Sequence, residues 1–116
     1  MNPDDATRAD HPAGGPLFWR LIDHLQDEYA DLTEGTIMGG PCVRVAGEFL
    51  GLVDYKGSGL VVKLPRARVE QLVATGIGRP FAPAGKVFRE WISVPVPDKD
   101  EWEGLLREGI KFVTKS

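Results

Sequence analysis

The stretch that decides the fold is VRVAGEFLGLV, which covers residues 43–53. Its residues are mainly β-branched or bulky and apolar, and the dipeptide Ala46-Gly47 divides it into two runs. Two such runs joined by a glycine-containing dipeptide are typical of a β-hairpin. Because a connection this short joins antiparallel strands, the sequence predicts an antiparallel sheet.

A third strand and a short helix follow the hairpin. Residues 60–64 form an apolar run after the turn Gly57-Ser58-Gly59, and Pro65 ends the run because proline cannot donate to a strand ladder. Proline suits the first position of a helix, so a second, short helix is predicted to begin there and to end at Gly76.

The last third of the chain is predicted to hold a loop, a strand and a helix. The segment 77–85 is rich in Gly and Pro and is expected to be a loop. Residues 87–94 predict a fourth strand, either continuous and bent or split in two around Arg89-Glu90. The final helix begins at Asp98, whose carboxylate can cap it, and Glu101 completes the capping box.

The first helix is predicted to begin near Leu17. Six apolar residues between Phe18 and Leu32 recur with a helical period, and Gly35 is a natural stop. The predicted fold class is therefore α+β, an antiparallel sheet of four to five strands with three helices in the order α-β-β-β-α-β(-β)-α. Residues 1–16 are expected to be an N-terminal tail, and residues 17–116 a single domain.

Composition places the chain among ordinary globular proteins. It has 116 residues, of which 42% are apolar and 27% charged. No apolar run is long enough for a membrane span, and the polar, acidic start does not resemble a secretory signal. Cys42 is the single cysteine, which is typical of a reducing compartment. A cytoplasmic location without membrane association is therefore expected.

The charge is unevenly distributed, although the net charge is only −3. Seven basic side chains and one acidic side chain give residues 56–89 a net charge of +6. A local excess of this kind can mark an interaction face. The residues considered as contacts for a nucleic acid or another anion are Lys63, Arg66, Arg68, Arg79, Lys86 and Arg89. The alternative is scattered, solvated charge, because alternation along strands would send these side chains to different faces.

The sequence offers no set of catalytic, cofactor-binding or metal-binding residues, so no cofactor is expected and an enzyme is not favoured. His24 has acidic neighbours on its helix, but a metal site needs three or four converging ligands. Cys42 has no nearby histidine to activate it and is better interpreted as a small buried residue.

Several segments together resemble a known family. They are Gly39-Gly40-Pro41, residues 43–49, Leu60 to Pro65, Arg79-Pro80-Phe81, Arg89 to Val94, and a final helix with Trp102, Leu105 and Phe112. Their order is similar to that in the amino-terminal domain of the competence regulator TfoX (Sxy) and in the related YjbR/MmcQ-like proteins. The family's usual Met-Phe-Gly-Gly is Ile37-Met38-Gly39-Gly40 here. The resemblance implies an antiparallel sheet with helices on one side, no established enzymatic activity and a link to regulation or DNA binding.

The sequence therefore leaves three candidate functions. The first is a non-enzymatic interaction or regulatory module with a protein partner not identified by the sequence, or with a second copy in a homodimer. The second is a nucleic-acid-binding protein that uses the basic segment 63–89. The third is a small-ligand binder or enzyme that uses the loop 78–85 as a pocket wall.

Overall fold

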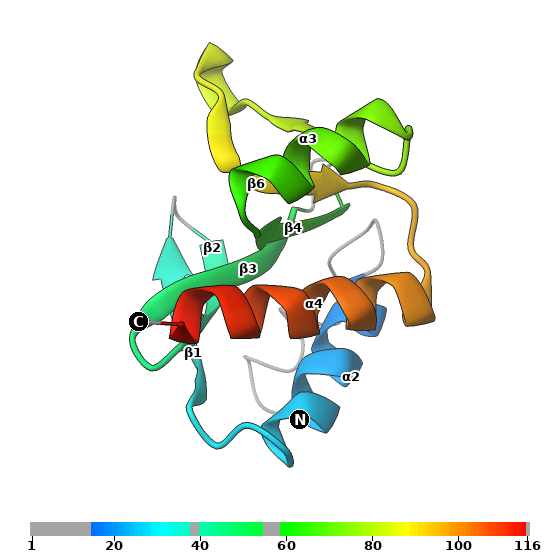
Figure 1. Cartoon of the computed structure of the whole chain (residues 1–116). Coiled ribbons are helices and arrows are strands. Elements are labelled where there is room, and N and C mark those ends of the chain that lie inside the picture. The colour runs from blue at the N-terminus through cyan, green and yellow to red at the C-terminus, as the bar shows by residue number, and fades with distance from the viewer. Residues whose placement is uncertain (1–14, 38–39, 55–58, 116) are drawn as a thin grey trace.

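The structure is a computed structural model that describes residues 15–37, 40–54 and 59–115. These residues form one six-stranded antiparallel sheet, in the spatial order β1-β2-β3-β4-β6-β5, and three α-helices (Figure 1). The elements along the chain are α2 Gly15–Gln26, β1 Leu32–Ile37, β2 Gly40–Val45, β3 Glu48–Asp54, β4 Gly59–Lys63, α3 Arg66–Ala74, β5 Arg79–Phe81, the 3₁₀ turn η1 Pro83–Gly85, β6 Phe88–Val94 and α4 Lys99–Thr114. The predicted α+β class is confirmed, with strand β1 and the short strand β5 added.

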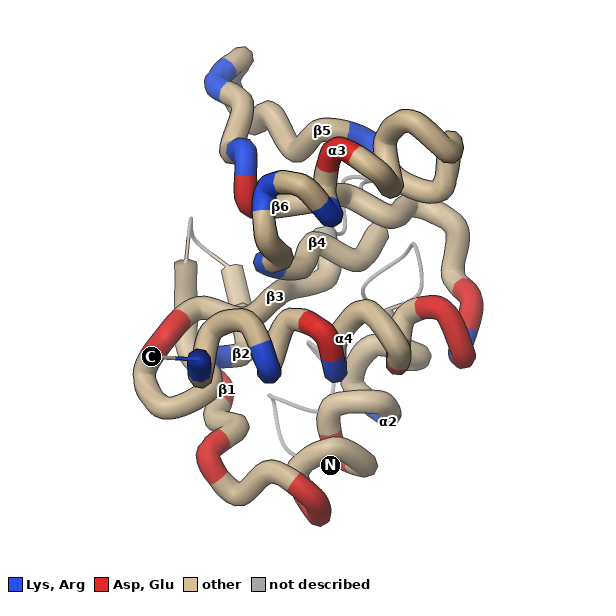
Figure 2. The backbone as a smooth tube through the Cα atoms, viewed as in Figure 1, with Lys and Arg blue, Asp and Glu red and all other residues tan. Residues whose placement is uncertain are grey.

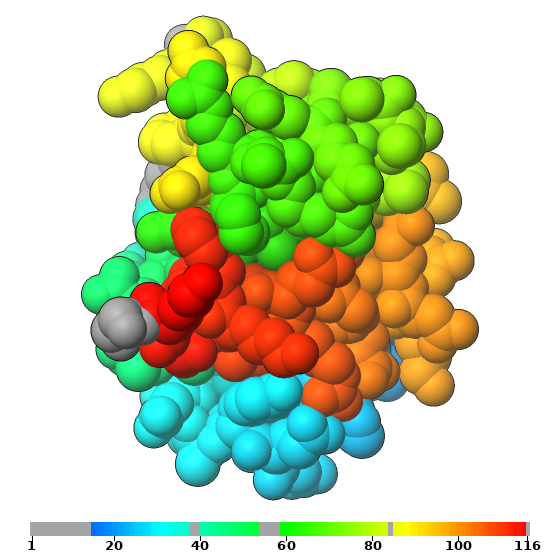
Figure 3. Space-filling view, viewed as in Figure 1, coloured from blue at the N-terminus to red at the C-terminus, as the bar shows by residue number. Residues whose placement is uncertain are grey.

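The helices cover one face of the sheet and form the main core with it (Figure 1). α2 and α4 lie over the central strands, and α3 packs on β6 and β5. Apolar side chains of all three helices meet inward-facing residues of the strands, including Val43, Leu60 and Ile92. Burial of one apolar face of each element is what holds such a layered domain together. In the space-filling view, α4 (orange to red) lies between α3 (green) and the blue-to-cyan segment that includes the end of α2 (Figure 3).

The predicted β2–β3 hairpin is confirmed. Ala46 and Gly47 both have positive φ angles, 51° and 84°. Positive φ at both central residues is the geometry of the type I′ turn, whose twist matches that of the strands it joins. The pairing of β2 with β3 carries an irregularity between Val43 and Arg44. Residues 57 and 58 of the next predicted turn lie outside the described residues.

The first helix is shorter than its apolar period predicts, and a strand replaces its second half. α2 ends at Gln26, and the amide of Tyr29 closes a turn on the carbonyl of Leu25. Residues 32–37 form edge strand β1, with Leu32 opposite Val45. Tyr29 and Leu32, whose spacing predicted a longer helix, instead reach the main core from a turn and from strand β1. The extension of the helix to Gly35 was therefore wrong.

The predicted loop 77–85 contains strand β5, which pairs with β6 at the sheet edge. Proline is tolerated there because an edge strand has a side without ladder partners. β6 is one continuous strand, and its pairing with β5 shifts between Pro80 and Phe81, opposite the predicted bend at Arg89-Glu90.

The predicted cap of the last helix is confirmed. The Asp98 side chain accepts a hydrogen bond of 2.9 Å from the amide of Glu101. Of the predicted tail, residues 1–14 lie outside the described part of the chain, and Gly15 and Pro16 belong to the first turn of α2. Within the described ranges, no helix is long and apolar enough to cross a membrane.

Candidate functional site

The sheet face opposite the helices carries a second apolar cluster. We call this surface the second face; it is formed by Cys42, Phe49, Leu52, Val61 and Phe81, with Ile37, Phe88 and Trp91 packed against them. No helix in the described ranges is part of this cluster. The two clusters arise because side chains alternate along a strand: in β4, Val62 points into the main core and Val61 points to the second face.

Four aromatic rings dominate the second face, and Trp91 stands at their centre. Its ring stacks on Phe49 at 4.1 Å between centroids and 15° between planes. Phe88 lies at 4.9 Å and 22°, and Phe81 at 5.6 Å and 18°. Phe49 and Phe81 are buried, whereas Trp91 and Phe88 are half-buried. These last two rings therefore supply most of the aromatic surface that a partner can touch.

Three residues of the predicted basic segment border this cluster. Lys63 is opposite Trp91 in the β4–β6 ladder, and Arg79 is opposite Ser93 in the β5–β6 ladder. Ser93 points to the second face because its neighbour Ile92 points into the main core. Residues opposite each other in an antiparallel ladder point to the same face, so Lys63 and Arg79 belong to the second face. The Lys86 ammonium lies 5.9 Å from the centroid of the Phe88 ring, within cation–π range.

The other three basic residues lie elsewhere. The Arg68 guanidinium donates two hydrogen bonds to the Glu108 carboxylate, at 2.9 and 3.1 Å, and so ties α3 to α4. Arg66 forms a 3.4 Å ion pair with Glu70 on the same helix. Arg66 and Arg89 both line a cavity between α3 and β6.

The six residues are thus close in space but do not form one patch. Figure 2 shows Lys and Arg positions gathered around α3, β5 and β6, while Asp and Glu predominate around the end of α2 and the start of α4. Three of the six border the second face, two lie at the cavity and one ties two helices together. Lys63 and Arg79 take their face from strand register, whereas Arg66 and Arg68 project from helix α3.

Neither of the two other residues considered for chemistry lies in an arrangement that activates it. Cys42 is fully buried at the base of the second face, and burial raises the pKa of its thiol. His24 is exposed on α2. No group of three His, Cys, Asp or Glu side chains suited to a metal ion occurs among the residues that the structure describes.

Sequence reasoning missed the aromatic cluster. Its four rings come from β3, β5 and β6, separated by up to 42 positions between Phe49 and Trp91, so no local motif marks them. The available signal was the aromatic content of residues 81–91, but the face of each ring depends on strand register. The chain has no significant match among protein-family models, curated proteins or solved structures. The resemblance to TfoX and YjbR-like proteins stays a prediction.

Proposed function

We propose that this chain is a non-enzymatic interaction module that binds a negatively charged partner through the second face. The observation that carries the proposal is the aromatic cluster around Trp91 with Lys63, Arg79 and Lys86 at its border. Aromatic and basic side chains are enriched at the centres of protein interfaces, where rings supply apolar contact and cations supply specificity.

The three bordering cations are available for a partner. None of them forms a salt bridge with a carboxylate of the described residues. A basic border steers acidic partners toward the surface and disfavours basic ones. It also disfavours a two-fold dimer through this face, because such an interface brings a surface patch against its own copy. A different, acidic molecule is the better partner for the second face.

Single-stranded nucleic acid is the second candidate, and the ring geometry favours it. The planes of Phe49, Phe81 and Phe88 all lie within 22° of the plane of Trp91. Stacked, nearly parallel aromatic rings beside basic side chains are how sheet surfaces hold unpaired bases and their phosphates. The resemblance to a family linked with DNA supports the same candidate.

The test compares two anionic probes, polyglutamate and a fluorescent single-stranded oligonucleotide, at low and physiological salt. Binding of either should weaken with salt and should quench Trp91, since Trp19 and Trp102 are buried in the main core. The variant Lys63→Glu/Arg79→Glu should lose binding. Lys111→Glu/Lys115→Glu, at the C-terminal end of α4 and its cap residue, makes the same charge change away from this face and should retain binding.

The two probes separate the two candidates. Preference for polyglutamate identifies an acidic protein as the partner, and preference for the oligonucleotide identifies nucleic acid. If neither probe binds, or if the α4 variant loses binding equally, the second face is not the interaction surface.

A further inference from the structure

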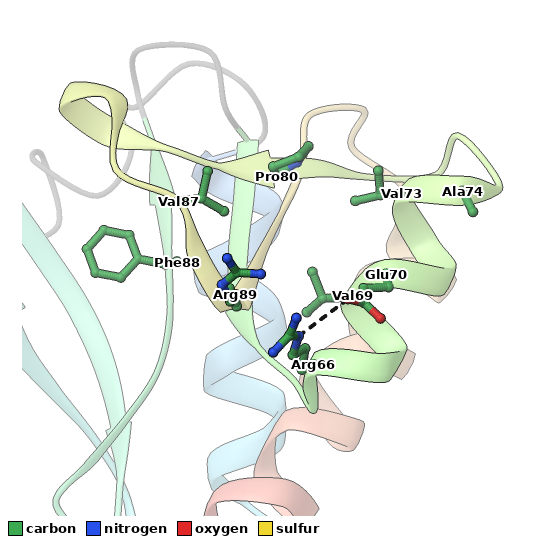
Figure 4. A pocket seen from close by; sticks show the side chains of 9 residues that line it. All are labelled: Arg66, Val69, Glu70, Val73, Ala74, Pro80, Val87, Phe88 and Arg89. Atoms are coloured by element: carbon green, nitrogen blue, oxygen red, sulfur yellow. Dashed lines mark hydrogen bonds and ion pairs between the residues drawn. The ribbon is translucent and has the colours of Figure 1, made fainter.

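A cavity of about 280 Å³ lies on the helix side of the sheet, between α3 and the β5–β6 pair (Figure 4). Its apolar walls include Val69 and Val73 of α3, Pro80 of β5, and Val87. Pro80 pairs with Ile92, a residue of the main core, which places Pro80 on the helix side of the sheet. Phe88 lines the cavity and also packs on the second face, so the two sites adjoin at this residue, whereas the five lining residues of α3 belong to the cavity alone.

The size of the cavity limits what it can hold. Its volume lies just below the usual range of small-molecule pockets and corresponds to about nine water molecules at their share of liquid volume. Val87, at one wall, is 52% exposed although it is a large apolar residue. An apolar group of one ring or a short alkyl chain would cover this side chain and displace water from the walls.

Two guanidinium groups and one carboxylate, that of Glu70, border the same cavity. Figure 4 shows Arg66 of α3 and Arg89 of β6 extending into the gap between the helix and the strand. Arg89 has no ion pair or hydrogen bond with any residue that the structure describes. The partner of Arg66 is Glu70, but this pair is long, 3.4 Å, and its side chains are 58% and 65% exposed. Such a pair contributes little, so an incoming anion can compete with Glu70.

Two arginines on different elements are suited to a planar anion. The guanidinium presents its N–H donors as a fork that matches the two oxygens of a carboxylate. A carboxylate at the mouth would join Arg66 of α3 to Arg89 of β6, while the apolar body of the same molecule lies against Val69 and Val87. We propose that this cavity binds small monocarboxylates with a short aliphatic or single-ring body.

The test uses octanoate and 1-octanol, which share a chain and differ in charge. Two-dimensional amide NMR of the labelled chain should show octanoate shifting residues 66–74 and 87–89. We expect octanoate to bind at least about tenfold more tightly than 1-octanol, the difference that charge-assisted hydrogen bonds produce. Arg89→Ala should reduce octanoate affinity by a similar factor and leave 1-octanol affinity nearly unchanged.

Two substitutions that each introduce one negative charge provide the matched control. Val87→Asp adds a second carboxylate beside Glu70 to the cavity lining, at an exposed position, so it should abolish octanoate binding without unfolding the chain. Val96→Asp makes the same change at a residue that is 70% exposed and does not line the cavity, and it should retain binding. Arg79→Glu, on the second face, should also retain it. Equal affinity for octanoate and octanol, octanoate binding that survives Val87→Asp, or amide shifts confined to the second face would overturn the proposal.

Discussion

Two glycines of α4, Gly104 and Gly109, differ in what a methyl group would meet. A Cβ at Gly109 would lie 2.8 Å from Cδ1 of Leu50 and 2.9 Å from the backbone oxygen of Lys63. The carbonyl cannot move without disturbing β4, so Gly109 sets how closely α4 approaches the sheet. At Gly104, nothing apart from the adjacent residues and the backbone of α4 itself lies within 4 Å of the added carbon.

This difference predicts opposite signs for the same substitution. Gly109→Ala should destabilise the chain by about 1–3 kcal/mol through overpacking. Gly104→Ala should stabilise it by about 0.5–1 kcal/mol, because alanine favours the helix more than glycine does. Urea unfolding followed by circular dichroism measures both. Equal effects at the two positions would contradict the observed packing of α4 on β3 and β4.

At the scale of elements, Arg107 links α4 to the turn after α2. Its guanidinium donates to the Glu28 carboxylate at 2.6 and 3.1 Å and to Glu103 at 3.0 Å. The hydrogen bonds from Arg107 hold the pKa of Glu28 below its ordinary value. The stability from this link is therefore fully present above the ordinary glutamate pKa and is lost as the pH falls through the lowered pKa of Glu28.

Removal of the cation should reverse that shift. In Arg107→Gln, the pKa of Glu28 should rise toward its ordinary value, and the stability of the chain should depend less on pH in the acid range. Carboxyl NMR titration of Glu28 measures the first effect, and urea midpoints at several pH values measure the second. Lys111→Gln, one turn further along α4, is the control and should leave the Glu28 titration unchanged. A Glu28 titration identical in both variants would show that the contact is not maintained in solution.

Elements with strong local signals could be predicted, and those defined by distant partners could not. The Ala46-Gly47 turn and the Asp98 cap are properties of a few adjacent residues, so the sequence determines them. β1 forms by pairing with β2, where Leu32 lies opposite Val45, and the residues adjacent to Leu32 in the sequence do not predict that pairing. The candidate site was only partly predictable for the same reason. The basic segment is visible in the sequence, but the face that Lys63 and Arg79 occupy follows from strand register.

At the scale of the whole molecule, the sheet is asymmetric. Its main core lies beneath three helices, whereas the second face is closed by side chains that pack on one another, with no helix of the described ranges in its cluster. Cys42 and Val43 are adjacent in β2, both are fully buried, and they belong to opposite faces. A layer without a covering element should open more readily than one that must release a helix.

Thiol labelling measures that difference directly. Cys42 should react with a thiol reagent faster than global unfolding allows and with weak urea dependence, because a local opening of the aromatic cluster is enough to expose it. The matched variant Cys42→Ala/Val43→Cys moves the single thiol to the helix side of the same strand. After correction for each chain's own unfolding free energy, the thiol at position 43 should react only through global unfolding, with strong urea dependence. Equal corrected rates at both positions would mean that the two faces open together. A faster Cys42 rate that a bound anionic partner suppresses would show that the second face opens locally and that partner binding keeps it closed.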